Sequence, residues 1–229
     1  MDKQLIFKLA VFLPVLLVGI IDYLTVFKNN FFLEEWENLP NEKEKKKYYI
    51  RLILYIVISL IVSLIIHLIK EKTINNSFIA GQLGSVLLMF MISIDTDIKY
   101  HVVNRHTLRM AYIIPFVFSI MRVSTLFEGI TLLGISLLIF VLFIFATNIG
   151  SSDFRAMVIA FMTAYPLKGP IVGLLILILG MSLSIMYYIY YKKKHKLTKK
   201  EMEKSGAPIA PAILVAPLIF LVGHLLLVA

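Results

Sequence analysis

The sequence predicts an all-α, polytopic membrane protein with about eight transmembrane helices. Of its 229 residues, 59% are hydrophobic and only 16% are charged, and the mean hydropathy is +0.87. Soluble globular domains do not have this composition. The apolar residues also come in blocks of about twenty, the length of helix that crosses about 30 Å of hydrocarbon. Because backbone groups in lipid must be hydrogen bonded within their own segment, these blocks are expected to be helices.

The apolar blocks set the order of the expected helices along the chain. They are Leu5–Phe27, Tyr48–Ile69, Phe78–Ile94, Leu108–Val123, Gly129–Ala146, Phe154–Leu167, Ile171–Tyr191 and Pro208–Val228. The sixth block is short, and Pro166 and Gly169–Pro170 are expected to break the chain after it. The first block is too long for the apolar part of a signal peptide and lacks a small-x-small cleavage site, so we expect the mature protein to keep it. The third block carries small residues, Ala80, Gly81, Gly84 and Ser85, which predicts close helix packing.

Basic residues predict the orientation in the membrane. One set of connecting segments holds Lys28, Lys43, Lys45, Lys46, Lys47, Arg51, Lys99, Arg105, Arg109, Arg155 and the run from Lys192 to Lys204. The opposite set holds only Lys3, Lys70, Lys72, Lys168 and Arg122. Because cytoplasmic loops carry the excess of Lys and Arg, the first set is expected in the cytoplasm and both termini outside a cell membrane.

Charge and cysteine content exclude several classes of function. The formal net charge is +9, but the lysines stand beside apolar blocks without interleaved aromatic residues, which argues against nucleic-acid binding. The chain has no cysteine, which excludes disulfides, thiolate metal sites and cysteine nucleophiles. No cofactor or metal is expected, and the lipid bilayer is an expected partner.

The candidate catalytic residues are aspartates. Apart from Asp2, the chain has only Asp22, Asp95, Asp97 and Asp153, and a charge at membrane depth costs about 2.5–3.5 kcal/mol on insertion scales. Asp97 follows the third block and Asp153 opens the sixth, so both are expected at the cytoplasmic ends of different helices. Two adjacent carboxylates do not both ionise easily, so one can take a proton from water while the other donates one to a peptide carbonyl. This is aspartyl hydrolysis, which needs no metal.

Other interpretations of these residues stay open at this stage. Ser151, Ser152 and Asp153 also suit a simple helix N-terminal cap. In a small transporter or ion-binding protein, Asp22, Asp95 and Asp153 would bind a proton or cation at broken helices. A third interpretation is a catalytically silent assembly protein. For Asp22 taken alone, the simplest expectation is a side chain that reaches water or pairs with Lys28.

Three sequence segments resemble motifs of a known family. Gly150-Ser151-Ser152-Asp153 resembles the G-x-G-D motif of the membrane aspartyl peptidases. Asp97, a basic stretch and then Val102-Val103-Asn104 resemble the first-aspartate segment of the type IV prepilin and archaeal preflagellin peptidases, and Pro208-Ile209-Ala210-Pro211 is similar to the proline-rich start of their final helix. Ser152 departs from the motif's second glycine, and Asn104 stands where a proline is usual.

The resemblance covers about residue 78 to the C-terminus and implies a function. It implies a six-helix peptidase core over residues 76–229, preceded over residues 1–75 by two additional helices and a cytoplasmic loop. Asp97 and Asp153 would be the catalytic pair, supported by Gly150, Ser151, Ser152 and Pro211. The substrates would be pilin or archaellin precursors, which lose a short basic leader (a class III signal peptide) at the cytoplasmic membrane face. The short loop and the lack of cysteine resemble an archaeal, peptidase-only form.

Asp95 competes with Asp97 for the role of first catalytic aspartate. The distance along the chain to Val103-Asn104 favours Asp97. Two residues apart on a helix, the two side chains are expected to point to different faces.

Overall fold

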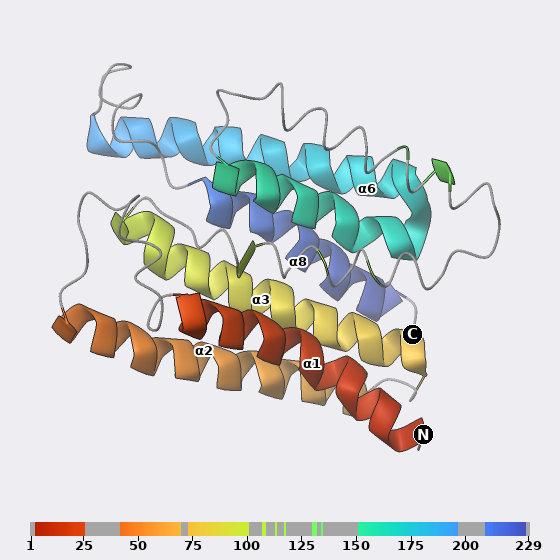
Figure 1. Cartoon of the computed structure of the whole chain (residues 1–229). Coiled ribbons are helices and arrows are strands. Elements are labelled where there is room, and N and C mark those ends of the chain that lie inside the picture. Colours follow the sequence, from red (N-terminus) through yellow and green to blue (C-terminus); the bar gives the residue numbers. More distant parts are fainter. Residues whose placement is uncertain are drawn as a thin grey trace.

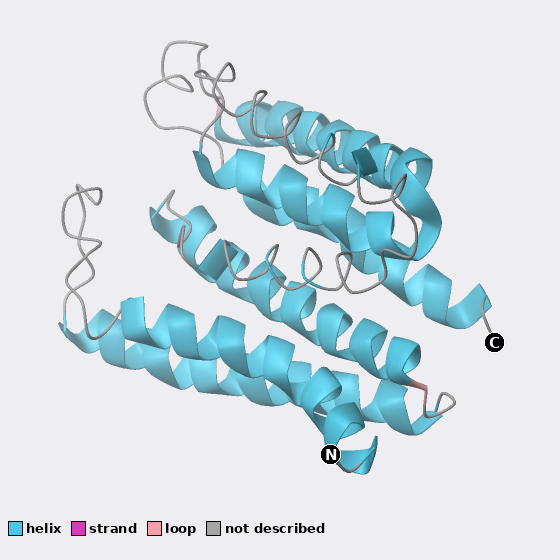
Figure 2. Cartoon of the chain, turned by 45° about the vertical axis from the view of Figure 1, so that its right-hand side comes forward, coloured by secondary structure: helices cyan, strands magenta, loops and turns pink. Residues whose placement is uncertain are grey.

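The computed structural model of the chain describes residues 3–25, 42–69, 73–100, 107–108, 113, 117, 130–131, 134, 151–196 and 209–227. The helices whose bounds are described are α1 (Lys3–Tyr23), α2 (Glu42–Ile69), α3 (Ile74–Tyr100), α6 (Ser151–His195) and α8 (Ala210–Leu227). The prediction of an all-α fold is confirmed for them, and Figure 2 shows helices as their regular structure.

The helices form a bundle in which α3 is central. It packs against α1 and α2 on one side and against α8 on the other, while α6 packs against α8 (Figure 1). Both chain termini lie at one end of the bundle. At the other end α1 and α3 finish and α2, α6 and α8 begin (Figure 1). Residues that are distant in sequence therefore meet at this second end.

Three helical segments are long and apolar enough to cross a membrane: Lys46–Ile69, Asn76–Asp97 and Leu167–His195. Two shorter apolar helices are Arg155–Tyr165 and Ala210–Leu226. The structure is thus compatible with a membrane protein, but the described residues support three full-length spans and not the expected eight. The expected blocks Leu108–Val123 and Gly129–Ala146 lie almost wholly outside the described residues.

The burial of the three long segments distinguishes their positions. The apolar window of α3 is 72% buried, against 22% for α2 and 17% for the second half of α6. Apolar side chains such as Ile53, Leu54, Val57, Ile61, Leu175 and Ile178 are therefore exposed on the outer helices. Such a surface suits lipid contact, because lipid solvates apolar side chains that water would not.

The break expected after the sixth block is present. Helix α6 turns back on itself at Gly169, whose φ of 82° is in the left-handed region that glycine adopts without strain. Pro170 follows directly, and its ring cannot continue the preceding helix. Helix α6 is therefore two antiparallel arms, which run from Ser151 to the turn and back to His195 (Figure 1).

The small residues of α3 allow α1 and α2 to approach its backbone. A Cβ added at Gly81 would collide with the carbonyl oxygen of Ala10 on α1, and one added at Gly84 would collide with the Ser63 hydroxyl on α2. The close packing predicted from the sequence is confirmed at these positions. The larger core cluster of the described residues includes Val15, Val18, Leu52, Leu88, Met89, Ile92, Ile159, Ile213 and Leu214.

Candidate active site

Asp97 lies in the last turn of α3 and is held by the start of α8. Its side chain is buried, and its Oδ2 atom accepts a hydrogen bond of 3.3 Å from the backbone N–H of Ala210. Ala210 is the first residue of α8, so this N–H has no partner within its own helix. The N-terminus of a helix carries a partial positive charge that suits a carboxylate. The last turn of α3 and the first of α8 therefore form one polar junction.

Asp153 reaches the same junction from α6. It lies in the first turn of α6 and is partly buried. Its carboxylate interacts electrostatically with that of Asp97. Burial raises the pKa of Asp153 from 3.8 to about 6, because a buried carboxylate loses the water that stabilises its charge. The two aspartates that the sequence analysis selected therefore lie near enough to interact electrostatically.

Such a pair suits acid–base chemistry near neutral pH. Interacting carboxyl groups titrate as a unit, so one proton is shared between them over a range of pH. A pKa near 6 lets Asp153 gain or lose a proton at physiological pH, which an ordinary surface aspartate does not do. The charged member can remove a proton from water, and the neutral member can donate one to a carbonyl oxygen.

The other motif residues are only partly described. Gly150 and the segment 102–104 lie outside the described residues. Ser151 and Ser152 form the first two positions of α6, so Asp153 stands at a helix N-terminus as the motif requires. Pro211 is buried directly after Ala210 in the first turn of α8. It therefore belongs to the helix start that holds Asp97.

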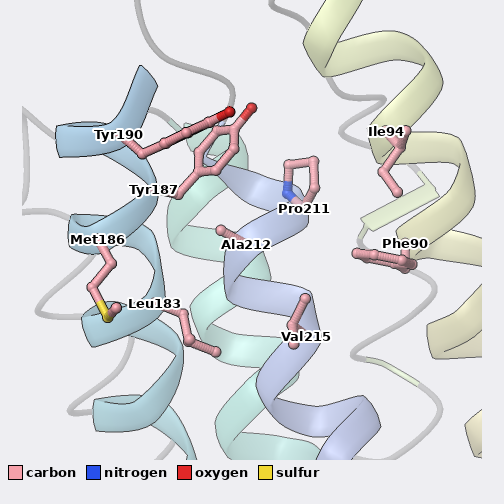
Figure 3. Close-up of a pocket in the computed structure, with 9 residues that line it drawn as sticks. All are labelled: Phe90, Ile94, Leu183, Met186, Tyr187, Tyr190, Pro211, Ala212 and Val215. Atoms are coloured by element: carbon pink, nitrogen blue, oxygen red, sulfur yellow. The ribbon is translucent and has the colours of Figure 1, made fainter. Parts of the chain in front are cut away.

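An apolar groove of about 490 Å³ lies beside this junction, between α3, α6 and α8 (Figure 3). Its lining is formed by Phe90, Ile94, Leu183, Met186, Tyr187, Tyr190, Pro211, Ala212 and Val215. Two observations place the groove next to Asp97: Pro211 follows Ala210 in sequence, and the Tyr187 side chain interacts electrostatically with Asp97. An apolar segment bound in the groove would therefore reach the carboxylate pair at one end.

The sequence analysis did not identify this groove. The feature of the sequence that indicates one wall of the groove is the i, i+3, i+4, i+7 spacing of one helix face, which Leu183, Met186, Tyr187 and Tyr190 follow. Tyr187 and Tyr190 point to the same end of the groove (Figure 3). Tyr190 also carries Lys194 over its ring, at 5.7 Å from the ring centroid.

Asp95 faces away from the carboxylate pair, toward α2. Its Oδ2 atom accepts a hydrogen bond of 2.5 Å from Nε of Arg51, and its side chain is 4% exposed. The expectation that Asp95 and Asp97 point to different faces of α3 is confirmed.

Asp22 is fully buried at the end of α1. Its two carboxylate oxygens accept hydrogen bonds from the hydroxyls of Tyr48, at 2.6 Å, and Thr107, at 2.8 Å. The expectation that Asp22 reaches water is wrong, because Tyr48 and Thr107 enclose it. Lys28, its other expected partner, lies outside the described residues.

The aspartates of the transporter interpretation are divided between two places. Asp22 and Asp95 bond to side chains of α2, whereas Asp153 interacts with Asp97 at the start of α8. Within the described ranges no three His, Cys, Asp or Glu side chains gather in a way that could hold a metal ion.

Comparison with known proteins gives no relative. No protein-family model, no curated protein and no solved structure matches the chain. The likeness to the prepilin and preflagellin peptidases therefore rests on the sequence motifs quoted above.

Proposed function

We propose that the chain is a membrane aspartyl endopeptidase that removes the short basic leader of pilin or archaellin precursors at the cytoplasmic membrane face. One observation carries this proposal: Asp97 and Asp153 come from different helices and interact beside the start of α8. A pair of structural caps would not need both carboxylates at one place, since each helix end can be capped separately.

The proposed reaction uses the two carboxyl groups and a water molecule. The charged group takes a proton from the water, whose oxygen attacks the peptide carbonyl carbon. The neutral group donates its proton to the carbonyl oxygen, which gives a neutral gem-diol. When the C–N bond breaks, the neutral carboxyl group donates its proton to the leaving amine and the charged carboxylate takes one from a gem-diol hydroxyl, so the pair again holds one proton.

The apolar groove supports a substrate with an apolar segment beside the scissile bond. Its lining offers hydrocarbon and aromatic side chains, and one of them, Tyr187, interacts electrostatically with Asp97. A precursor whose apolar helix follows a basic leader has this composition. The helix would lie in the groove, and the leader would extend past the carboxylates.

The site position also supports the proposed topology. The carboxylate pair and the two chain termini lie at opposite ends of the bundle (Figure 1). In a multi-pass cell-membrane protein of about eight helices, a cytoplasmic site would then leave both termini outside. The proposed six-helix core would comprise residues 76–229, and the two N-terminal helices and their loop residues 1–75.

The proposal is tested by incubating the purified protein, in lipid nanodiscs, with a tagged pilin or archaellin precursor. Leader removal is followed by mass spectrometry of the new N-terminus. Asp97→Asn and Asp153→Asn keep the shape of each side chain and remove its charge, so each should lower the cleavage rate by at least about 10³-fold. Asp95→Asn is the matched comparison on the same helix and should retain measurable cleavage. Undiminished cleavage by either of the first two variants would exclude the proposed pair.

A further inference from the structure

Helix α2 holds α3 just before Asp97. Arg51 and Asp95 form an ion pair between the two helices, and Asp95 stands two residues before Asp97. Asp95 is nearly inaccessible to water, whereas the Arg51 side chain is 31% exposed. A carboxylate buried to this extent needs its partner, because an unpaired buried charge is costly.

Helix α1 holds the chain on the other side of Asp97. Asp22 accepts a hydrogen bond from the hydroxyl of Thr107, which stands ten residues after Asp97. The same carboxylate also accepts a hydrogen bond from the hydroxyl of Tyr48 on α2. Asp95 before Asp97 and Thr107 after it are thus each bonded to one of the N-terminal helices.

From these contacts we propose that α1 and α2 act as a clamp that positions Asp97 for the reaction, with Arg51 and Asp22 as positioning residues. The inference rests on the proposed peptidase function and adds a role for helices that lie outside the region of family resemblance. The clamp has two contacts: the Arg51–Asp95 ion pair, and the hydrogen bond from Thr107 to Asp22. The ion pair joins α2 to α3, and the hydrogen bond joins Asp22 at the end of α1 to Thr107.

The ion pair also determines the charge near Asp97. While Arg51 and Asp95 are paired, their charges largely cancel at Asp97. Loss of Arg51 alone leaves a negative charge that disfavours the charged form of the catalytic pair, and loss of Asp95 alone leaves a positive charge that favours it. Two unit charges about 10 Å apart shift a titration by about half a pH unit at an effective dielectric constant of about 40.

The charged and titratable groups around Asp97 come from four helices. Asp153 and Tyr187 face it from α6, and α8 presents the uncharged N–H of Ala210. The groups on α2 and α1 are gathered around Asp95 and Thr107 and comprise Arg51, Tyr48, Tyr55 and Asp22. Arg51 is the cation that lies next to Asp95.

The test is a charge cycle at the ion pair in the full-length protein. Arg51→Gln, Asp95→Asn and the double variant are compared in the precursor-cleavage assay from about pH 4 to pH 9. We expect each single variant to lower kcat by about 10- to 100-fold, as small displacements of a catalytic group do, with little change in KM. The acidic limb of the kcat profile should move to higher pH in Arg51→Gln and to lower pH in Asp95→Asn. In the double variant it should return close to the wild-type position.

Lys47→Gln is the control for charge removal, because Lys47 is an exposed cation on α2 one turn before Arg51. It should leave both kcat and the pH profile unchanged. Arg51→Lys should restore part of the activity, since it keeps the charge next to Asp95.

The second contact of the clamp, the hydrogen bond from Thr107 to Asp22, is tested with Thr107→Val, which removes one hydroxyl and keeps the shape of the side chain. It should lower kcat with little change in KM. Thr163→Val is the matched control, because the Thr163 hydroxyl is buried and bonds only to a carbonyl of its own helix among the contacts seen.

Two results would overturn the clamp. One is wild-type kcat and pH profile in both single variants of the ion pair. The other is an equal loss in both without any shift in the profile, which indicates a purely structural contact. Either result counts against the clamp alone if Asp97→Asn and Asp153→Asn are inactive in the same assay. Cleavage by those two variants would instead reject the proposed function.

Discussion

The backbone N–H of Ala210 donates a hydrogen bond to Oδ2 of Asp97, and this bond joins the last turn of α3 to the first residue of α8 across 113 positions of sequence. Ile209 precedes the helix, and the carbonyl of Ile209 accepts the first hydrogen bond of α8, from the N–H of Ile213. The N–H of Ala210 is therefore free to face outward. Because α8 begins at Ala210, the N–H of this residue is available to donate to Asp97.

Ala210→Pro should impair cleavage without unfolding α8. Proline has no N–H, so the bond to Asp97 is lost, yet proline is well tolerated in the first turn of a helix. Hydrogen bonds to charged groups contribute about 1.5–3 kcal/mol, which corresponds to a fall of about 10- to 100-fold in kcat/KM. Ala210→Gly is the control, since it keeps the N–H. Equal activity in the two variants would show that the bond does not matter to catalysis.

Asp153→Asn should stabilise the protein at alkaline pH. The pKa of Asp153 is raised by burial to about 6 from 3.8, so the folded protein binds this proton more tightly than the unfolded chain does. The stability gained from that proton is complete below about pH 4 and is lost as the pH rises through about 6. An amide carries no charge and avoids this loss.

The measurement is Tm in nanodiscs between about pH 4 and pH 8. The Tm of the wild-type protein should fall below that of Asp153→Asn as the pH rises, and the two Tm values should converge near pH 4. A constant gap at every pH would contradict the assignment of a buried, titrating carboxyl group. Asp95→Asn should instead destabilise the protein at pH 8, with a loss of about 1–3 kcal/mol in the free energy of unfolding, because it breaks the contact to Arg51.

Local sequence patterns predicted the individual helices well. The length of the apolar blocks indicated α1, α2, α3 and α8, and the Gly169–Pro170 pair indicated the turn inside α6. Helical periodicity also placed Asp95 and Asp97 on different faces of α3. Each of these features depends on residues that are close together in sequence.

Contacts between helices were much harder to predict. Asp22 meets Tyr48 and Thr107 from 26 and 85 positions away, and periodicity does not say which helix faces which. The groove was not predicted from the sequence for a second reason. In lipid, an apolar face that lines a groove and an apolar face that contacts acyl chains have the same composition, so Leu183, Met186, Tyr187 and Tyr190 gave no contrast with the rest of α6.

Val215→Trp should weaken substrate binding. Val215 lines the apolar groove on α8, and an indole there would fill part of its 490 Å³. We expect KM for the precursor to rise by about tenfold, with a smaller change in kcat, since the carboxylate pair lies at the far end of the groove.

Val222→Trp is the control for this substitution, because Val222 is 45% exposed on the same helix and does not line the groove. It should leave KM unchanged. If both variants cleave the precursor with the wild-type KM, the groove does not bind the substrate.

Gly81→Ala and Gly223→Ala should change stability in opposite directions. A Cβ at Gly81 would collide with the backbone carbonyl of Ala10, and backbone cannot rotate away as a side chain can. Overpacking of this kind costs about 1–3 kcal/mol. A Cβ at Gly223 meets nothing within 4 Å, so alanine there should stabilise α8 by up to about 1 kcal/mol, the difference in helix propensity.

Thermal unfolding in nanodiscs measures both variants, with Tm lowered for Gly81→Ala and unchanged or raised for Gly223→Ala. Because α1 is part of the proposed clamp, displacement of α1 in Gly81→Ala should also reduce kcat. Asp22 is part of α1, so its hydrogen bond to Thr107 would then be disturbed. Normal Tm and kcat in Gly81→Ala would mean that α1 does not approach α3 as closely as the packing at Gly81 requires.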